Sequence, residues 1–147
     1  MCKRYVDQVV IVTGGAKGIG WGIAKVFSQE GAKVVIADWD DVNGPKTAEE
    51  LRQAGGEAIY IKCDVSNEDQ VKAMVEQTIQ TFGRIDVLVN NAGIGVYKSV
   101  LDTSSEDWDR CLNVNLKGVF LCSKYVIPYM QKQGKGNIIN ISSVHSF

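Results

Sequence analysis

The chain has 147 residues, of which 45% are hydrophobic and 22% charged, and its 16 Lys and Arg against 17 Asp and Glu leave a formal net charge of -1. This length and composition predict one globular domain, and the near-neutral charge excludes a strongly basic nucleic-acid-binding protein and an acidic disordered tail. No apolar run approaches the ~20 residues that cross a bilayer, and an acid, Asp7, stands where a secretory signal needs an apolar core. We therefore expect a cytoplasmic protein with no membrane or nucleic-acid partner.

The chain begins with a strand, a helix and a second strand. A β-branched run at residues 8–13 predicts a strand buried on both faces. Helical spacing starts at residue 19 and stops at Gly31, and a second strand is predicted at residues 33–38. The apolar stripe of the helix should consist of Ile19, Ile23, Val26 and Phe27.

The next elements are more polar. Residues 42–54 predict a helix that ends before a pair of glycines, and residues 58–63 predict a third strand. Ser66 and Asp69 have the spacing of a capping box, which indicates the start of a helix that continues to Phe82.

The last third of the chain contains the longest helical pattern. A fourth strand is predicted at residues 85–89, and another helix start at residues 104–107 begins a helical stretch that continues to about residue 133. Pro128 removes a backbone donor within this stretch, so we expect a kink there. A fifth strand is predicted at residues 137–141.

Five strands that alternate with four helical regions predict an α/β fold, a doubly wound parallel sheet in three α/β/α layers. Such sheets bind ligands outside the carboxyl ends of the strands, where the strand order reverses. The fifth strand should lie at the edge of the sheet with unpaired backbone groups. We therefore expect that the polypeptide continues past Phe147 or that a second chain supplies further strands.

The cysteines do not suggest a metal site or a disulfide. The four cysteines are spread along the chain without a C-x-x-C pair, and there is only one histidine, His145. No zinc-ligand spacing results, so we expect no metal and interpret the cysteines as buried or half-buried free thiols.

A glycine-rich segment lies between the first strand and the first helix. Residues 13–20 place glycines in a G-x-x-x-G-x-G pattern. Glycines allow a tight turn and close approach to a pyrophosphate, while the helix N-terminus offers free N–H groups and a positive dipole. No Lys-Ser or Lys-Thr pair follows the glycines, so this is not a Walker A loop. The pattern predicts a dinucleotide site, with an ordinary tight turn as the alternative.

Asp38 ends the second strand, eighteen residues after Gly20. A carboxylate there can accept hydrogen bonds from the adenosine ribose hydroxyls and repel a 2′-phosphate, which favours NAD over NADP. Lys17 weakens this prediction, because a cation in the glycine loop attracts an additional phosphate. The alternative interpretation of Asp38 is a solvated acid at a strand end.

Five segments, in order along the whole chain, resemble motifs of the short-chain dehydrogenases/reductases. They are residues 13–20 (TGxxxGIG), 63–65, 90–93 (NNAG), 113–120 and 141–143. The resemblance implies a Rossmann-like fold, truncated after the fifth strand, that binds a nicotinamide dinucleotide, and Asp38 favours NAD over NADP as that cofactor. With Asp38 included, the residues expected to bind the cofactor are Gly14, Ala16, Lys17, Gly18, Ile19, Gly20, Asp38, Asp64, Val65, Asn90, Asn91, Ala92 and Gly93.

The resemblance also implies two catalytic residues. Ser143 takes the position of a serine that hydrogen-bonds the reacting oxygen, and Asn115 that of an asparagine that holds a water of the proton relay. The acid–base pair of the family, Y-x-x-x-K, lies about a dozen residues beyond the serine and does not occur before the last residue, Phe147. A polar residue near the end, His145, is either part of a substrate pocket or a frayed terminus.

The activity implied by the resemblance is hydride transfer between a nicotinamide and a secondary alcohol or ketone. Its partner is a small alcohol or carbonyl compound, and members of the family are usually homo-oligomers, tetramers or dimers. An alternative is a non-catalytic dinucleotide-binding or interaction module, because a fold does not fix a function.

Overall fold

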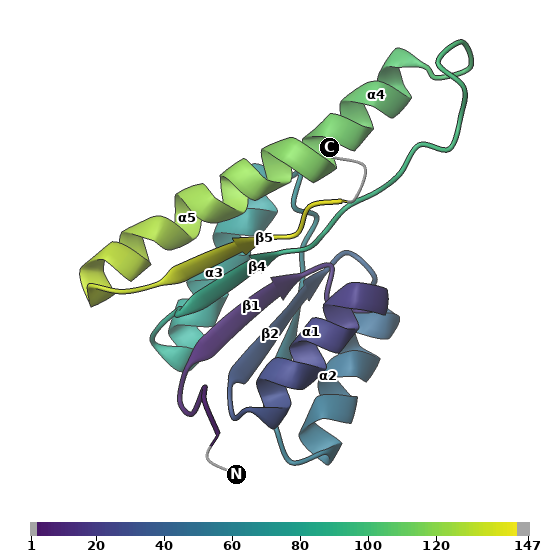
Figure 1. Ribbon diagram of the computed structural model, residues 1–147. Helices are drawn as coiled ribbons and strands as arrows, with labels where there is room; N and C mark the ends of the chain where they lie inside the picture. The colour runs from purple at the N-terminus through teal and green to yellow at the C-terminus, as the bar shows by residue number, and fades with distance from the viewer. Residues whose placement is uncertain (1–2, 144–147) are drawn as a thin grey trace.

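A computed structural model of the chain describes residues 3–143 and has an α/β architecture (Figure 1). The strands are β1 Val9–Thr13, β2 Lys33–Asp38, β3 Glu57–Lys62, β4 Val87–Asn90 and β5 Asn137–Asn140. The helices are α1 Gly18–Gln29, α2 Asn43–Gln53, α3 Glu68–Phe82, α4 Ser105–Leu112, the π-helical η1 Asn113–Lys117 and α5 Gly118–Gln133. All five predicted strands are present, and their bounds differ from the predicted ones by no more than two residues.

The strands form one parallel sheet in the order β3-β2-β1-β4-β5. Ile11 in the central strand lies opposite Val35 in β2 and Leu88 in β4. The chain moves outward from β1 to β3 and then returns to the other side of β1, so the strand order reverses between β1 and β4. Parallel sheets of this kind bind ligands at that reversal, beyond the carboxyl ends of the strands.

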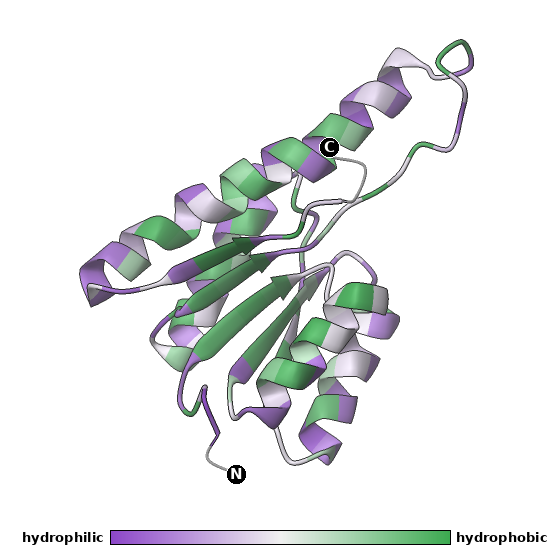
Figure 2. Ribbon diagram, in the orientation of Figure 1, coloured by the Kyte–Doolittle hydropathy of each residue, from purple (hydrophilic) through white to green (hydrophobic). Residues whose placement is uncertain are grey.

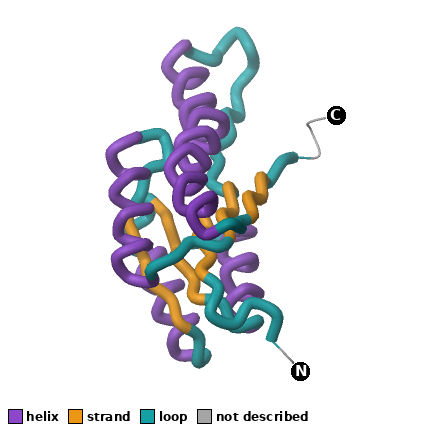
Figure 3. The backbone as a smooth tube through the Cα atoms, turned by 90° about the vertical axis from the view of Figure 1, so that its left-hand side faces the viewer, coloured by secondary structure: helices purple, strands orange, loops and turns teal. Residues whose placement is uncertain are grey.

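Two apolar layers pack against the two faces of the sheet, which confirms the predicted three-layer, Rossmann-like fold. Val9 and Ile11 face a cluster that includes residues of α3 and α5, while Val10 and Val12 face a cluster with residues of α1 and α2. The strands are apolar along most of their length (Figure 2), as expected when both faces are covered. Figure 3 shows helices on either side of the strands.

The apolar stripe predicted for α1 is wrong at two of its positions. Ile19 is 70% exposed and Val26 is 55% exposed, whereas the buried residues of the helix are Gly20, Ala24 and Ser28. Small residues on this face let the helix backbone come close to the sheet and the glycine-rich turn. The large apolar side chains of Ile19 and Val26 therefore lie away from the buried face of the helix.

The predicted capping box is also wrong. Asn67, not Ser66, is the N-cap of α3, and its side chain accepts a hydrogen bond from the Gln70 amide at 3.1 Å. The Ser66 hydroxyl instead donates to the Asp64 carboxylate at 2.7 Å. Asparagine and serine are about equally good caps, so the position of the chain decides between them.

The helix start predicted at residues 104–107 is confirmed, and the structure shows a capping box there. The Ser104 hydroxyl accepts a hydrogen bond from the Asp107 amide, and the Asp107 carboxylate accepts one from the Ser104 amide. The helical stretch that follows is interrupted by the π-helical segment η1, which the sequence pattern did not predict. Pro128 lies inside α5, which continues to Gln133, and the kink expected at Pro128 stays a prediction.

The outer strand β5 has one neighbour in the sheet, β4. Ile139 and Ile141 are 41% and 42% exposed, so this side of the sheet is only partly covered within residues 3–143. Cys63 and Cys122 are buried free thiols and Cys111 is a half-buried one, whereas Cys2 lies outside the described residues. None of the helices in the described part has the length and apolarity to cross a membrane.

Asp86, which directly precedes β4, connects β4 to the start of β1 through a side-chain hydrogen bond. Its buried carboxylate accepts hydrogen bonds from the Val9 amide at 2.9 Å and from the Arg84 guanidinium at 2.6 and 2.7 Å. Burial by itself raises the pKa of Asp86, but the bonds from Arg84 and Val9 outweigh it and hold that pKa below its usual value. The ionised form is thus the one that the fold stabilises.

Asp86→Asn is expected to lower the free energy of unfolding at pH 7 by about 2 kcal/mol, the typical contribution of hydrogen bonds to a charged group. Because the folded pKa is lowered, the contribution is complete above the unfolded pKa of about 4 and is lost as the pH falls through the folded pKa. Urea unfolding at pH 7 and pH 3 measures this, and the difference between variant and wild type should shrink at pH 3. An equal difference at both pH values would show that the charge of Asp86 does not matter.

Candidate functional site

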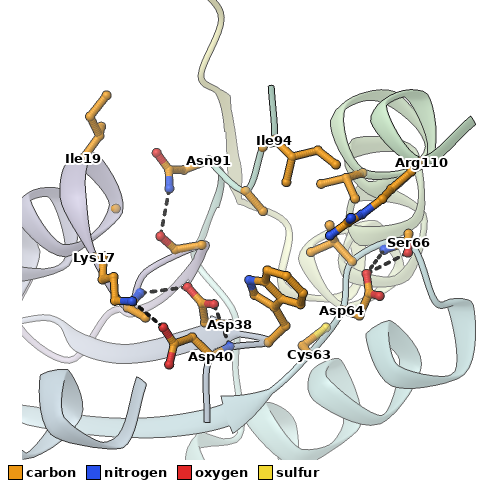
Figure 4. A pocket seen from close by; sticks show the side chains of 18 residues that line it. Lys17, Ile19, Asp38, Asp40, Cys63, Asp64, Ser66, Asn91, Ile94 and Arg110 are labelled. Atoms are coloured by element: carbon orange, nitrogen blue, oxygen red, sulfur yellow. Dashed lines mark hydrogen bonds and ion pairs between the residues drawn. The ribbon is translucent and has the colours of Figure 1, made fainter. Parts of the chain in front are cut away.

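A pocket of about 620 Å³ lies beyond the carboxyl ends of β1, β2 and β4 (Figure 4). Its volume is within the range of about 300–1,000 Å³ that is typical of ligand sites. The predicted cofactor-binding residues that line it are Gly14, Ala16, Lys17, Ile19, Gly20, Asp38, Asp64, Val65, Asn91, Ala92 and Gly93. The remaining lining residues, Trp39, Asp40, Cys63, Ser66, Ile94, Arg110 and Val114, were not among the predicted ones. The fold therefore brings eleven of the thirteen predicted residues to one cavity.

The glycine-rich turn approaches the end of β4 closely. Gly14 has a φ of +63°, and a Cβ atom at this position would lie 2.9 Å from the Cα of Ala92. A side chain is therefore excluded by both conformation and space. The N-cap of α1 is Lys17, whose side chain makes no capping hydrogen bond, and Lys17, Ile19 and Gly20 line the pocket. The positive end of the helix dipole and its unpaired first N–H groups therefore lie at the pocket. This is an arrangement that fits an anionic pyrophosphate.

Asn91, which directly follows β4, forms hydrogen bonds with the glycine-rich turn. Its side-chain amide donates to the carbonyls of Thr13 at 2.9 Å and Gly14 at 3.1 Å. The Thr13 hydroxyl accepts hydrogen bonds from the backbone amides of Asn91 and Ala92, both at 3.0 Å. These four hydrogen bonds connect the glycine-rich turn to the end of β4.

Asp38 lies at the carboxyl end of β2 and is only 7% exposed. Its carboxylate accepts hydrogen bonds from the backbone amides of Ala16 and Asp40, each at 3.0 Å. The Ala16 carbonyl in turn accepts a hydrogen bond from the Thr47 hydroxyl at 2.8 Å. The carboxylate is thus held beside the glycine-rich turn, and each of its oxygens has further lone pairs with which to accept hydroxyl donors.

The pocket wall also contains an aromatic and a guanidinium group that sequence reasoning missed. The Arg110 guanidinium lies 5.9 Å from the ring centroid of Trp39, although the two come from different parts of the chain. Trp39 directly follows a strand, and the rule that ligands bind after strand ends could have identified it. Arg110 had no such signal, because only the path of the chain after β4 brings α4 to the pocket.

The third strand contributes a short polar segment to the pocket. The Asp64 carboxylate accepts hydrogen bonds from the Ser66 amide at 2.9 Å and the Ser66 hydroxyl at 2.7 Å. Burial, with a smaller contribution from the Asp64 and Asp38 charges, raises the pKa of the neighbouring Cys63 thiol to about 12. Cys63 therefore lines the pocket as a neutral, unreactive thiol.

Two predicted cofactor-binding residues, Gly18 and Asn90, are not among the residues that line the pocket. The Asn90 amide donates to the Asn140 side chain at 2.9 Å and to the Ser123 hydroxyl at 3.4 Å. It therefore connects β4 to β5 and α5. Gly18 has a φ of +56° at the first position of α1, where it completes the turn.

Asn115 lies in the π-helical segment η1 and binds the backbone after β4. Its side-chain amide donates to the Ile94 carbonyl at 2.8 Å, and its side-chain oxygen accepts from the Ile94 amide at 2.8 Å. Ile94 lines the pocket, whereas Asn115 itself is outside the lining. The observed arrangement is that of an asparagine that positions the wall of the pocket.

Ser143 is the last residue that the structure describes. It is exposed and follows β5, whose register with β4 places Asn140 opposite Asn90. Ile141 continues this pairing through its backbone amide, which donates to the Asn90 carbonyl at 2.9 Å. Ser143 therefore lies at the same edge of the sheet as the pocket but is not part of its lining. His145 lies outside the described residues.

Within residues 3–143 no group of three or more His, Cys, Asp or Glu side chains is placed to hold a metal ion. The groups that are present fit a dinucleotide. They provide a glycine-rich turn at a helix N-terminus, a carboxylate at the end of β2 and a wall that is partly apolar.

Comparison with known proteins places this site in a family. A family profile described as short chain dehydrogenase matches residues 8–147. The chain is 44% identical over 140 residues to an uncharacterized oxidoreductase of Thermotoga maritima, covering 95% of this chain and 55% of that protein. It is 47% identical over 146 residues to tropinone reductase-like 2 of Erythroxylum coca (97% and 52%) and 42% identical over 142 residues to cyclopentanol dehydrogenase of a Comamonas strain (97% and 57%). The chain spans about half the length of these curated relatives, and it belongs to the short chain dehydrogenase family.

Proposed function

We propose that the protein carrying this chain is an NAD-dependent oxidoreductase that transfers a hydride between the nicotinamide and a secondary alcohol or ketone. The observation that supports this most strongly is the pocket in which Asp38 lies beside the glycine-rich turn at a helix N-terminus. When bound, the nicotinamide accepts or supplies the hydride. The names of the relatives, which include a cyclopentanol dehydrogenase and reductases, support the same reaction class.

In this proposal, the residues of this chain would bind and orient the dinucleotide and stabilise charge on the substrate oxygen. The turn at residues 13–20 would hold the pyrophosphate through backbone N–H groups, and Asp38 would accept the ribose hydroxyls. Ser143 would donate a hydrogen bond to the oxygen of the substrate and stabilise charge that develops there. Asn115 would position the Ile94 backbone and take part in the proton relay of the family. The Y-x-x-x-K pair of that relay does not follow Ser143 within the 147 residues.

Self-association is part of the same proposal. Several apolar side chains of α4, η1 and α5 are exposed, among them Trp108 at 61%, Leu116 at 66% and Phe120 at 60%. Exposed apolar groups on one helical stretch are typical of a surface that another protein covers. They support the expectation, drawn from the family resemblance, that the whole protein is a homo-oligomer.

The alternative function is a dinucleotide-binding module without catalysis. Both functions predict that NADH binds, and only the enzyme predicts turnover. The test titrates the whole polypeptide that carries these residues with NADH, follows tryptophan emission, and then assays a panel of alcohols and ketones. Binding with turnover supports the proposal, binding without turnover across the panel favours the module, and the absence of NADH binding contradicts both.

Asp38→Asn is expected to weaken NADH binding by about tenfold and to narrow the preference for NADH over NADPH. The substitution removes the charge that repels a 2′-phosphate and one acceptor for the ribose hydroxyls, and a hydrogen bond to a charged group contributes about 1.5–3 kcal/mol. Fluorescence titration with both cofactors measures this. An unchanged ratio of the two dissociation constants, in a variant with unchanged circular dichroism, would remove Asp38 from the cofactor site.

A further inference from the structure

The cation of the glycine-rich turn has a partner close to the cofactor pocket. The Lys17 ammonium lies 2.7 Å from Oδ2 of Asp40, and both residues line the pocket (Figure 4). The Asp40 side chain is 23% exposed and that of Lys17 is 64% exposed. An isolated lysine at this position would attract a 2′-phosphate, and here it is already neutralised.

We propose that Asp40 is a specificity-determining residue, which neutralises Lys17 and thereby keeps the site selective for NAD over NADP. This inference rests on the proposed function, because it assumes that a nicotinamide dinucleotide occupies the pocket. It goes beyond the role of Asp38, since it assigns the selectivity to a second carboxylate that would not itself contact the ribose.

Asp40 is held in place by its own part of the chain. Its Oδ1 atom accepts hydrogen bonds from the backbone amides of Val42 at 3.1 Å and Asn43 at 2.8 Å, and the Asn43 side-chain amide donates to both carboxylate oxygens. The carboxylate therefore does not need to reorganise to meet Lys17. The bond from Lys17, followed by those from Asn43, holds the pKa of Asp40 well below its usual range, so Asp40 stays ionised at neutral pH.

The pair is connected directly to Asp38. The Asp40 amide donates to Oδ1 of Asp38, and Ala16, which precedes Lys17, donates its amide to Oδ2. The three charged groups therefore form one cluster with a net charge of -1. A 2′-phosphate, which carries about -1.5 to -2, would meet two carboxylates and a cation that is already paired. Without the Asp40 charge, the net charge would be zero and the ammonium free to bind the phosphate.

Asp40→Asn tests the inference with little change of shape. The amide oxygen can keep the bonds from the backbone amides of Val42 and Asn43, while the amide nitrogen that replaces Oδ2 can accept a hydrogen bond neither from Lys17 nor from the Asn43 side chain. In the whole polypeptide, titration with NADH and with NADPH should show that NADPH affinity relative to NADH increases roughly 10- to 100-fold, the range for one gained hydrogen bond to a charged group. Adding Lys17→Met to this variant should abolish the gain.

Asp41→Asn is the matched control. It removes the same charge one residue further along, where Asp41 pairs with Lys62 at 2.7 Å and both side chains are 61% exposed, outside the pocket lining. The ratio of NADPH to NADH affinity should stay at its wild-type value in this control. Equal changes in Asp40→Asn and Asp41→Asn would overturn the inference, because the effect would then be one of net charge.

Lys17→Met alone provides a measurement that does not depend on the folding of the Asp40 variant. If Lys17 is neutralised, this substitution lowers NADPH affinity by no more than it lowers NADH affinity. A selective loss of NADPH affinity would overturn the inference. If the wild-type protein binds NADH but Asp40→Asn leaves the ratio of NADPH affinity to NADH affinity unchanged, only this inference is contradicted. If the wild-type protein binds neither cofactor, the proposed function is contradicted as well.

Discussion

Gly20→Ala is expected to lower NADH affinity by roughly 100-fold or more and to destabilise the fold. A Cβ atom at this position would lie 2.1 Å from the Gly14 carbonyl oxygen and 2.6 Å from the side-chain nitrogen of Asn91. The nearest neighbour is backbone and cannot rotate away, so α1 or the turn must move. Overpacking of this kind costs about 1–3 kcal/mol, and a displacement of about 1 Å at a binding turn is enough for the loss of affinity.

Gly22→Ala is the matched control for this prediction. Gly22 lies in the same helix, and a Cβ atom there would meet nothing within 4 Å. Alanine favours a helix over glycine by about 0.8–1.0 kcal/mol, so this variant should be slightly more stable and should bind NADH like the wild type. Thermal unfolding and NADH titration of both variants test the pair. If Gly20→Ala bound NADH as tightly as Gly22→Ala, the glycine-rich turn would not be the pyrophosphate site.

The strands and the helix cap at Ser104 could be predicted from the sequence, because each depends on residues that are close together in the chain. The strands β1, β2 and β4 are short apolar runs that are buried along nearly their whole length, and such runs are typical of parallel strands covered on both faces. The cap at Ser104 was predictable for the same reason, because serine and aspartate three residues apart satisfy each other within one turn.

Tertiary contacts decided the features that the sequence pattern missed. Ile19 belongs to an apolar pattern, yet the close approach of α1 to the turn at Gly14 buries Gly20 and leaves Ile19 exposed. Trp39 and Arg110 lie far apart in the sequence, and no periodic pattern predicts a contact between them. The ion pair between Lys17 and Asp40 could not be predicted either, because it forms only when β2 lies beside β1 in the sheet.

The π-helical segment η1 is another feature that the sequence pattern did not predict, and it lies next to the pocket. Its residues continue the helical pattern of α4 and α5, so the sequence did not distinguish it from an ordinary helix. Short π segments inside helices are often found at functional sites. Here the segment contains Asn115, whose amide binds both backbone groups of Ile94 in the pocket wall. An asparagine that is unfavourable within a helix thus has a specific partner outside it.

Ser143→Ala is expected to lower kcat by roughly 10²- to 10³-fold while it leaves the affinity for NADH nearly unchanged. A hydroxyl that donates to a developing negative charge contributes in the transition state, and removing one such donor costs about this factor. The serine lies outside the lining of the cofactor pocket, which is why binding of the dinucleotide should not depend on it. Kinetics and NADH titration of the whole polypeptide, with the substrate identified from the panel, measure both quantities.

The neighbouring serine gives the control that separates chemistry from structure. Ser142 precedes Ser143 on the same exposed segment after β5, and Ser142→Ala removes the same hydroxyl group one position earlier. The family resemblance assigns the contact with the substrate oxygen to Ser143 and leaves Ser142 a structural residue. Turnover should therefore fall in Ser143→Ala and much less in Ser142→Ala. A larger loss of NADH affinity than of kcat in Ser143→Ala, or an equal loss of kcat in both variants, would make Ser143 a structural residue.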